Sequence, residues 1–358
     1  MGDGAAGQER TTAVLERAAQ RPAHAYLLVG PRGSGVEDAA RAFAAQLVGA
    51  HDERGRDLVR RGVHPDVVEF EPVGAQYVVD EAQAVRHEAH RAPTEGERRV
   101  LVVHEAEKLC RPIAVTANAL LKTLEEPPPR TVIVLVTSVP EDLLPTIRSR
   151  CQRIDLDPVP DDVVAATLRR DGVPADAAAL AAALGGGQLA RARALCGPLR
   201  ALRDVAASVP QRVTGTGANA VALAEELDAA VEAAASRVAE RHAAELAEFD
   251  ADMERHGYDE RDAQRLRRRI EKRHQREARR ARIDLLLEAV TAIETVYRDV
   301  LAAGAPPLNA DRPPLTVAAR AAAAALDACR EAREAFVVNE KGLVRLVALV
   351  MALPPATG

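Results

Sequence analysis

The chain has 358 residues, of which 47% are apolar and 28% are charged, and its formal net charge is −5. This length allows two or three domains, and the composition is ordinary for a globular protein. The negative net charge argues against a protein coated in nucleic acid, although a local basic patch remains compatible with it. Apolar runs end before the roughly 18 residues of a membrane span, and the N-terminus lacks the basic-then-apolar order of a signal peptide. We therefore expect a cytoplasmic protein.

Strand and helix patterns alternate over the first 157 residues. Helices are expected at 11–20, 38–47, 78–90 and 113–124, and strands at 26–29, 64–70, 99–103 and 131–136. The segment 49–62 is polar and is expected to be irregular. Continuous apolar runs such as 99–103 and 131–136 are typical of strands that are covered on both faces of a parallel sheet. We therefore predict an α/β domain with a mainly parallel sheet over residues 1–157.

Strand patterns are absent after residue 157. Short Ala-rich helices over 161–197 predict a small helical lid domain at 158–203. Residues 219–303 and 315–353 also have helical patterns, with proline pairs between them. We therefore predict an all-α domain over 204–358.

The four cysteines are far apart and form no C-x-x-C pair. They are Cys110, Cys151, Cys196 and Cys329. Zinc sites and disulfide frameworks need closer or more regular spacing. We therefore expect reduced thiols in or near the cores, with neither a disulfide framework nor a metal site.

A glycine-rich turn, GPRGSGVE, follows the first strand and precedes a helix. A P-loop has the form G-x-x-x-x-G-K-[ST], in which the Lys binds phosphate and the Ser or Thr binds Mg²⁺. Val36 and Glu37 stand at those two positions, and a carboxylate there would repel a triphosphate. The turn glycines Gly30, Gly33 and Gly35 are thus predicted to form a degenerate P-loop that is empty or binds weakly.

The strand at 99–103 is followed by His104 and Glu105. In P-loop ATPases such a strand ends in an Asp that binds Mg²⁺, followed by a Glu that polarises the attacking water. Histidine replaces that Asp poorly, because Mg²⁺ prefers oxygen ligands. The P-loop Lys-[ST] pair and the Mg²⁺-binding Asp are thus both missing, and both serve the same hydrolytic reaction. Their loss predicts that the hydrolytic site is inactive or absent. If the glycine-rich turn is considered by itself, an equally good interpretation is a simple strand-to-helix connection that never bound nucleotide.

Later segments distinguish between these alternatives. Residues 116–128 read TANALLKTLEEPP and residues 143–151 read LLPTIRSRC. Together with HAYLLVGP at 24–31 and the His-Pro-Asp turn at 64–66, they resemble the clamp-loader branch of the AAA+ ATPases. The resemblance is strong over residues 20–157, fair over the lid, and weaker in the helical remainder.

The resemblance implies roles for single residues. Arg150 matches the family's arginine finger, which reaches the γ-phosphate of ATP bound to a neighbouring subunit, and a planar guanidinium suits phosphate oxygens. Thr137 matches a sensor position that is vestigial here. Arg191 lies one place later than the family's second sensor arginine, so an ordinary helix-surface role is expected. Many family members carry a four-cysteine zinc module at 49–63, where this chain has no cysteine, so no zinc is expected.

The resemblance therefore implies a clamp-loader subunit without intrinsic ATPase activity. It would be grouped with DNA-directed DNA polymerases, the nucleotidyltransferases of replication, although it polymerises nothing. Its expected partners are gamma/tau-like and delta-like subunits, the sliding clamp and primed DNA, and its C-terminal helices would join an oligomerisation collar. The alternative is an ATP-hydrolysing gamma/tau-like motor subunit or a related remodeller, in which another Lys and carboxylate compensate for Val36, Glu37 and His104.

The segment 261–282 has eleven Arg or Lys residues and three acidic residues. A cationic helix of this kind can follow DNA phosphates. It can also pair with the acidic stretch 240–260 in a helical hairpin, which we prefer because charge runs are usually solvated faces. Aromatic residues for base stacking are missing, apart from Tyr258.

Overall fold

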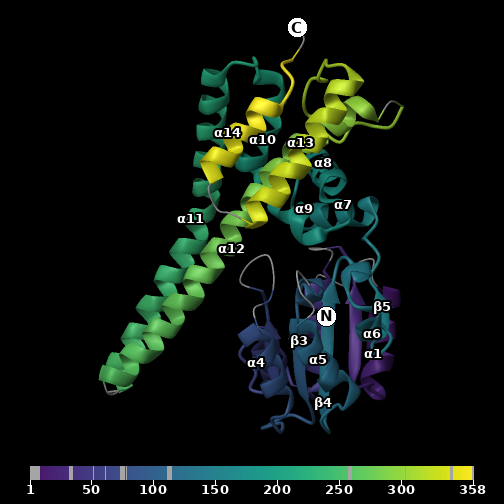
Figure 1. The fold of residues 1–358 in the computed structure, drawn as a ribbon, viewed down its shortest axis with the longest axis vertical. Coiled ribbons are helices and arrows are strands. Elements are labelled where there is room, and N and C mark those ends of the chain that lie inside the picture. Colours follow the sequence, from purple (N-terminus) through teal and green to yellow (C-terminus); the bar gives the residue numbers. More distant parts are fainter. Residues whose placement is uncertain are drawn as a thin grey trace. The chain divides into compact units, whose positions relative to one another are not determined.

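The computed structural model describes residues 9–31, 35–50, 52–60, 62–72, 77, 79–110, 115–256, 260–302, 304–338 and 342–356 (Figure 1). Its residues form two compact units, 1–193 and 194–358. The finer division into domains ending at residues 157 and 203 stays a prediction.

The first unit is built around a five-stranded parallel sheet in the order β2-β3-β4-β1-β5 (Figure 1). Its strands are β1 (Ala25–Val29), β2 (Val67–Phe70), β3 (Arg99–Val103), β4 (Thr131–Thr137) and β5 (Gln152–Asp155). Strands β3 and β4 are buried along their whole length, as expected for apolar runs covered on both faces. The predicted parallel sheet is confirmed. The sequence did not predict β5, an edge strand in which only Ile154 is buried.

Helices cover both faces of this sheet. They are α1 (Glu9–Gln20), α2 (Val36–Leu47), α3 (Glu53–Arg60), α4 (Val79–Ala89), α5 (Val115–Glu125) and α6 (Pro145–Arg148), with 3₁₀ turns η2 (Ala106–Cys110) and η3 (Pro140–Asp142). One apolar core includes Leu15 of α1 and Phe43 of α2. The other includes Val85 of α4 and Leu120 of α5. The unit is therefore a three-layer sandwich of helices, sheet and helices.

The prediction that residues 49–62 are irregular is wrong, because α3 lies within them. The Asp52 carboxylate caps this helix by accepting the N–H of Gly55 at 2.8 Å. Val59 is 1% exposed and attaches the helix to the core. A single buried residue in eight gives too weak an apolar period to be recognised in the sequence.

Three short helices follow the sheet, as the lid pattern predicted. They are α7 (Asp161–Arg170), α8 (Ala175–Gly185) and α9 (Leu189–Cys196). The turn after α8 depends on glycine at position 187. Its φ is 76°, and a Cβ there would lie 2.8 Å from the carbonyl oxygen of Val159.

The second unit is helical. It consists of α10 (Arg200–Arg212), α11 (Gly217–His256), α12 (Glu260–Leu301), α13 (Ala319–Val338) and α14 (Gly342–Ala352). One apolar core joins all five helices. Helices α11 and α12 lie side by side as a long hairpin (Figure 1). Fully buried core residues end at Val231 on α11 and begin at Leu286 on α12, so the two helices continue beyond the core as a two-helix arm.

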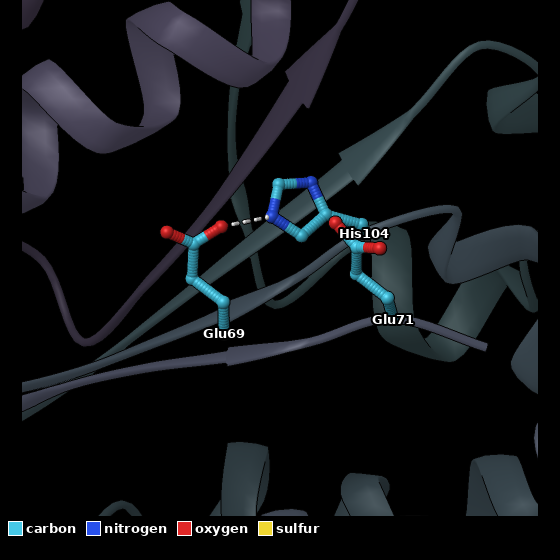
Figure 2. A group of neighbouring side chains, drawn as sticks. All are labelled: Glu69, Glu71 and His104. Carbon is cyan, nitrogen blue, oxygen red and sulfur yellow. Dashed lines mark hydrogen bonds and ion pairs between the residues drawn. The ribbon is translucent and has the colours of Figure 1, made fainter. Parts of the chain in front are cut away.

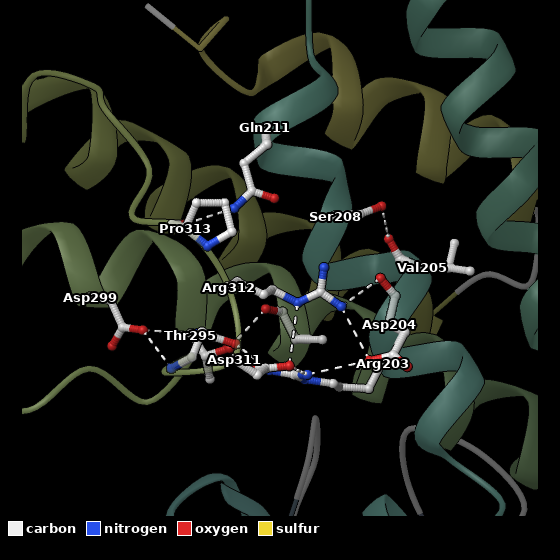
Figure 3. A network of polar contacts seen from close by, with 12 residues as sticks. Arg203, Asp204, Val205, Ser208, Gln211, Thr295, Asp299, Asp311, Arg312 and Pro313 are labelled. Atoms are coloured by element: carbon white, nitrogen blue, oxygen red, sulfur yellow. Dashed lines mark hydrogen bonds and ion pairs between the residues drawn. The ribbon is translucent and has the colours of Figure 1, made fainter.

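A polar network fixes the segment between α12 and α13 against α10 (Figure 3). The Arg203 side chain, only 6% exposed, donates to Asp311 Oδ1 at 2.7 Å and to Asn309 Oδ1 at 2.9 Å. The carboxylate of Asp299 accepts the backbone N–H groups of Leu308 and Asn309 at 2.8 and 2.9 Å. The proline-rich break between the helices is thus an ordered connection.

Among the described residues, no helix combines the length and the apolar character that crossing a bilayer requires.

Candidate functional site

The glycine-rich turn connects β1 to α2, as the sequence predicted. Gly30 follows β1, and its N–H donates to the carbonyl oxygen of Thr137 at the end of β4 (3.1 Å). Gly35 precedes α2 with φ 90° and ψ 7°, a left-handed conformation that favours glycine. Gly33 lies outside the described residues. Gly30 and Gly35 thus lie at the two ends of a strand-to-helix turn, as the sequence predicted.

The side chain at the lysine position of this turn is part of the apolar core. Val36 is 1% exposed and packs in the cluster that also contains Phe43. Glu37 follows it in the first turn of α2. In a working P-loop the Lys leaves this position to reach a bound phosphate. Here a buried valine and a carboxylate offer a phosphate no positive side chain.

His104, directly after β3, is bonded to Glu69 of β2 (Figure 2), and Glu69 in turn pairs with Arg41 of α2. It is 3% exposed, and its Nε2 lies 2.8 Å from Glu69 Oε2. The same carboxylate receives Arg41 of α2, whose Nε and Nη2 donate at 2.9 and 3.0 Å. Burial alone would raise the pKa of Glu69, but hydrogen bonds from His104 and Arg41 outweigh it and lower the pKa. Glu69 is therefore an ionised carboxylate held by two partners.

Glu69, Glu71 and His104 also form the one cluster of three metal-ligating groups within the part of the chain that the structure describes. One ligand atom from each lies within 4.8 Å of the others (Figure 2). Arg41 already neutralises Glu69 from the α2 side, so a cation here would have to displace a bidentate guanidinium. The donor set of one imidazole and two carboxylates also suits transition metals better than Mg²⁺. Mg²⁺ chemistry therefore does not fit these residues.

Two other positions that were predicted to lie at the nucleotide site also form contacts within the first unit. Glu105 has φ 48° and lies in an ion pair with Lys108. Thr137, which the sequence resemblance predicts to be a vestigial sensor, is 1% exposed and donates from Oγ1 to Glu107 Oε2 at 2.6 Å. Burial raises the pKa of Glu107, and the hydrogen bond from Thr137 offsets this only in part. Glu105 is thus held by a cation, and Thr137 by a carboxylate of its own unit.

Arg150 lies between α6 and the edge strand β5, and its side chain is 35% exposed. Its Nη2 donates to Glu125 Oε1 at 2.8 Å, and its Nη1 donates to the carbonyl oxygen of Thr146 at 3.0 Å. Both contacts lie at the surface. Arg150 is therefore oriented by its own unit but stays accessible to another molecule.

Two other predicted residues have structural contacts. Arg191 donates from Nη1 to the carbonyl oxygen of Leu184 at 2.7 Å, close to the C-terminal end of α8. Burial raises the pKa of the Cys151 thiol to about 12, which makes a reactive thiolate unfavourable.

The His-Pro-Asp turn has a structural role that its sequence did not reveal. The side chain of Asp66 is fully buried, and its carboxylate accepts the backbone N–H groups of Thr94, Glu95 and Gly96 at 2.6 to 2.7 Å. Burial alone would raise the pKa of Asp66, but these amide donors lower it overall. Arg99 Nη1 lies 3.6 Å away. Asp66 thus fixes the chain that leads into β3.

Part of the basic helix pairs with the acidic stretch. Arg267 Nη1 lies 2.7 Å from Asp250 Oδ2, and His274 Nε2 lies 2.8 Å from Glu245 Oε2. The ring of His274 stacks on that of His242, with centroids 4.0 Å apart. These contacts run between α11 and α12, so the preferred hairpin interpretation is confirmed.

Comparison with known proteins identifies the relatives of the first unit. Residues 7–160 match the family model described as DNA polymerase III, delta subunit. The chain is 40% identical over 139 residues to DNA polymerase III subunit delta' of Pseudomonas aeruginosa, covering 36% of this chain and 42% of that protein. It is 34% identical over 146 residues to the delta' subunit of Bacillus subtilis, covering 39% and 44%. It is 36% identical over 160 residues to the tau subunit of Bacillus subtilis, covering 42% and 28%.

Among solved structures, a gamma subunit-related protein of DNA polymerase III from Thermotoga maritima covers 95% of this chain and 97% of its own, with 17% identity and a TM-score of 0.48. The chain spans less than half of the length of the curated relatives named above.

The sheet order, the glycine-rich turn after β1 and the helices on both faces define the first unit as an AAA+ domain of the P-loop class. Within that class, residues 7–160 match the family model of the DNA polymerase III delta subunit and are similar to both delta' and tau subunits of that polymerase. The resemblance inferred from the sequence motifs is therefore confirmed for this region.

Proposed function

We propose that this chain is a delta-prime-like subunit of a bacterial clamp loader, which assembles with ATP-hydrolysing neighbours and does not hydrolyse ATP itself. Support comes from the buried Val36 at the lysine position and from His104, which is bonded to Glu69 at the metal-ligand position. The observation that carries the proposal is the contrast between these buried groups and the accessible Arg150.

Arg150 is proposed to act as an arginine finger on ATP bound to the neighbouring subunit. A guanidinium has five N–H donors. Two of them bind Glu125 and Thr146, and the other three have no acceptor among the described residues. Three donors of fixed orientation suit the charge that develops on a γ-phosphoryl group. Hydrolysis by the neighbour would then depend on assembly.

The proposed neighbours are gamma/tau-like and delta-like subunits, and the assembled complex would place a sliding clamp on primed DNA. The helical second unit is proposed to join a collar. One side of α14 exposes Leu343, Val344 and Met351, with exposed fractions of 39%, 66% and 56%. Such an apolar row is suited to packing against a collar helix of the next subunit.

An ATP-hydrolysing gamma/tau-like subunit is the second candidate, because the tau subunit of Bacillus subtilis is as similar to this chain as the delta' relatives are. It requires micromolar nucleotide binding by the isolated chain. A titration with a fluorescent ATP analogue distinguishes the candidates. We expect no saturable binding at micromolar concentrations, and binding with turnover would overturn our proposal.

The finger role is tested by Arg150→Ala in the reconstituted complex. A finger supplied in trans is worth roughly 10³-fold or more in rate at the site it serves. We therefore expect the complex to assemble normally and to lose the share of DNA-stimulated phosphate release that comes from that site. Arg153→Ala is the matched control, since Arg153 is nearby, 48% exposed and paired with Asp155. An unchanged rate in assembled Arg150→Ala complex would refute the finger role.

A further inference from the structure

Two glutamates and a histidine meet at the carboxyl ends of β2 and β3. Glu69 lies in β2 and Glu71 directly follows it, and this spacing of two places both side chains on one face of the strand. Phe70 pairs with Val103 where the two strands end. The next residues along each strand, Glu71 and His104, therefore lie side by side. Figure 2 shows the two carboxylates reaching toward the His104 ring.

The backbone that carries these side chains is fixed. The hydroxyl of Tyr77 lies 2.8 Å from the carbonyl oxygen of Phe70 and 2.6 Å from that of His104. The N–H of His104 also donates to the carbonyl oxygen of Phe70 at 2.9 Å. The two strand ends are thus held together before any ligand binds, which reduces the conformational entropy that binding costs.

The three groups are close enough to share one metal ion. One ligand atom from each lies within 4.8 Å of the others. Ligand atoms of a tetrahedral zinc site are roughly 3.4 Å apart, so the widest pair must close by at most roughly 1.4 Å. His104 Nε2 and Glu69 Oε2 are already 2.8 Å apart. A metal bound by both replaces the proton between them, and rotation of the long Glu71 side chain supplies the third ligand.

Arg41 competes with a cation for this set. Its Nε and Nη2 donate to the Glu69 carboxylate at 2.9 and 3.0 Å. A second acidic partner is near, because Arg41 Nη1 lies 3.6 Å from Asp38 Oδ1. The side chains of Arg41 and Asp38 are 30% and 68% exposed, so the guanidinium can turn from Glu69 toward Asp38 and water. Displacing Arg41 therefore weakens metal binding but does not prevent it.

Glu71 is suited to the role of third ligand. It is exposed, and an exposed carboxylate exchanges its contacts for a cation at little cost. Removing its side chain also leaves the bonds of Glu69 with Arg41 and His104 in place. Glu71 is therefore the position at which metal binding can be separated from folding.

We propose that Glu69, Glu71 and His104 bind a divalent transition-metal ion, with Zn²⁺ as the expected ion. Imidazole nitrogen and carboxylate oxygen are both zinc ligands, and three protein ligands leave the fourth position to water. Mg²⁺ and Ca²⁺ fit less well, because they take six or more oxygen ligands. The bound ion ties the end of β2 to the end of β3 through side chains, in addition to the backbone contacts of Tyr77.

The test is a titration of the full chain with Co²⁺, followed by visible absorbance, and then with Zn²⁺. Four-coordinate Co²⁺ absorbs far more strongly than six-coordinate Co²⁺ held by single surface histidines, so the intensity of the band reports the geometry of the site. We expect a saturable, intense band in the parent chain. Zn²⁺ should abolish it by displacing Co²⁺.

Three variants locate the site. Glu71→Gln removes one ligand and should lower the affinity for Co²⁺ at least about tenfold. Glu126→Gln is the matched control, because Glu126 is an exposed glutamate of the same unit outside the set, and it should leave the titration unchanged. Arg41→Gln removes the competing guanidinium and should raise the affinity several-fold. Circular dichroism checks that all variants keep the fold of the parent.

Four results would overturn the proposal. They are no intense band in the parent chain, an unchanged affinity in Glu71→Gln, an equal loss in Glu126→Gln, and weaker binding by folded Arg41→Gln than by the parent. The inference does not depend on the proposed function, because the isolated chain is titrated without nucleotide or partner subunits.

Discussion

Charged residues have opposite surroundings in the two units. In the first unit, Asp66, Glu69 and His104 are buried or nearly buried, and each is bonded to partners from other elements. In the arm of the second unit, by contrast, the ion pair between Arg267 and Asp250 lies at the surface, with side chains that are 46% and 41% exposed. Removing one partner of a buried, hydrogen-bonded charge is costly, whereas an exposed ion pair contributes little to stability.

This contrast bears on the glycine-rich turn that was predicted to be a degenerate P-loop. An ATPase must leave its carboxylates and cations available to nucleotide and metal. In this chain, Arg41 and His104 both form hydrogen bonds with Glu69, and Thr137 donates a hydrogen bond to Glu107. The residues predicted to lie at a nucleotide site thus take part in the internal bonding of the unit. Removing charges should therefore affect stability strongly in the first unit and weakly in the arm.

The largest effect is expected for Asp66→Ala. It leaves three backbone N–H groups without an acceptor and removes the charge near Arg99, which is 3% exposed. We expect the free energy of unfolding to fall by about 3–5 kcal/mol, measured by urea denaturation. Asp52→Ala is the control, because Asp52 accepts one N–H at an exposed helix start and should cost about 1 kcal/mol. Similar losses in the two variants would contradict the role of burial.

The Asp66 carboxylate should also make the stability of the protein depend on pH. Its folded pKa is lowered from the ordinary value of 3.8, so its contribution to stability is complete above that value. The contribution is lost as the pH falls through 3.8 toward the lower folded pKa. Asp66→Asn should therefore be less stable than the parent at pH 7, with a difference that shrinks toward pH 2. A difference that stays constant over this range would rule out the ionised carboxylate as the cause.

A smaller effect is expected for Glu69→Ala. Arg41 and His104 both lose their partner, but the Arg41 side chain is 30% exposed and can turn toward water. We expect a loss of about 1–3 kcal/mol. Glu71→Ala tests a neighbouring exposed glutamate of the same cluster and should cost less than about 0.5 kcal/mol. If Glu71→Ala were the more destabilising variant, the network would have been assigned to the wrong carboxylate.

Glu107→Gln should increase the free energy of unfolding, whereas the preceding substitutions lower it. Burial raises the folded pKa of Glu107, so its stabilising contribution is complete below the ordinary value of 4.5 and is lost as the pH rises through the folded pKa. A neutral amide keeps an acceptor for Thr137 and removes the cost of the buried charge. We expect the variant to gain about 0.5–1 kcal/mol over the parent at pH 8 and little at pH 4. A variant that loses stability as the pH rises would contradict this account.

The sequence predicted the central sheet because β3 and β4 are buried on both faces, which leaves uninterrupted apolar runs. It missed β5 and α3, where Ile154 and Val59 are the only fully buried residues. A helix or strand that packs against the core through a single residue shows no clear hydrophobic period in its sequence.

Within the candidate site, motif position alone identified Val36, Glu37 and His104. The partners of His104 could not be predicted, because they depend on the register of the sheet. Glu69 lies 35 residues before His104, and the parallel pairing of β2 with β3 brings the two together. Arg41 lies another 28 residues away. A glutamate within an otherwise apolar strand was the only available signal.

The smallest effect is expected for Arg268, an exposed arginine of α12 in the arm. Arg268→Gln should change the free energy of unfolding by less than about 0.5 kcal/mol, as is usual for surface substitutions. Arg282→Gln is the contrasting variant, because Arg282 is 23% exposed and lies in ion pairs with Asp228 and Glu232. It should cost about 1 kcal/mol. If Arg268→Gln lost more stability than Arg282→Gln, exposure would not explain the cost of removing a charge from the arm, and the comparison between buried and exposed charges would fail.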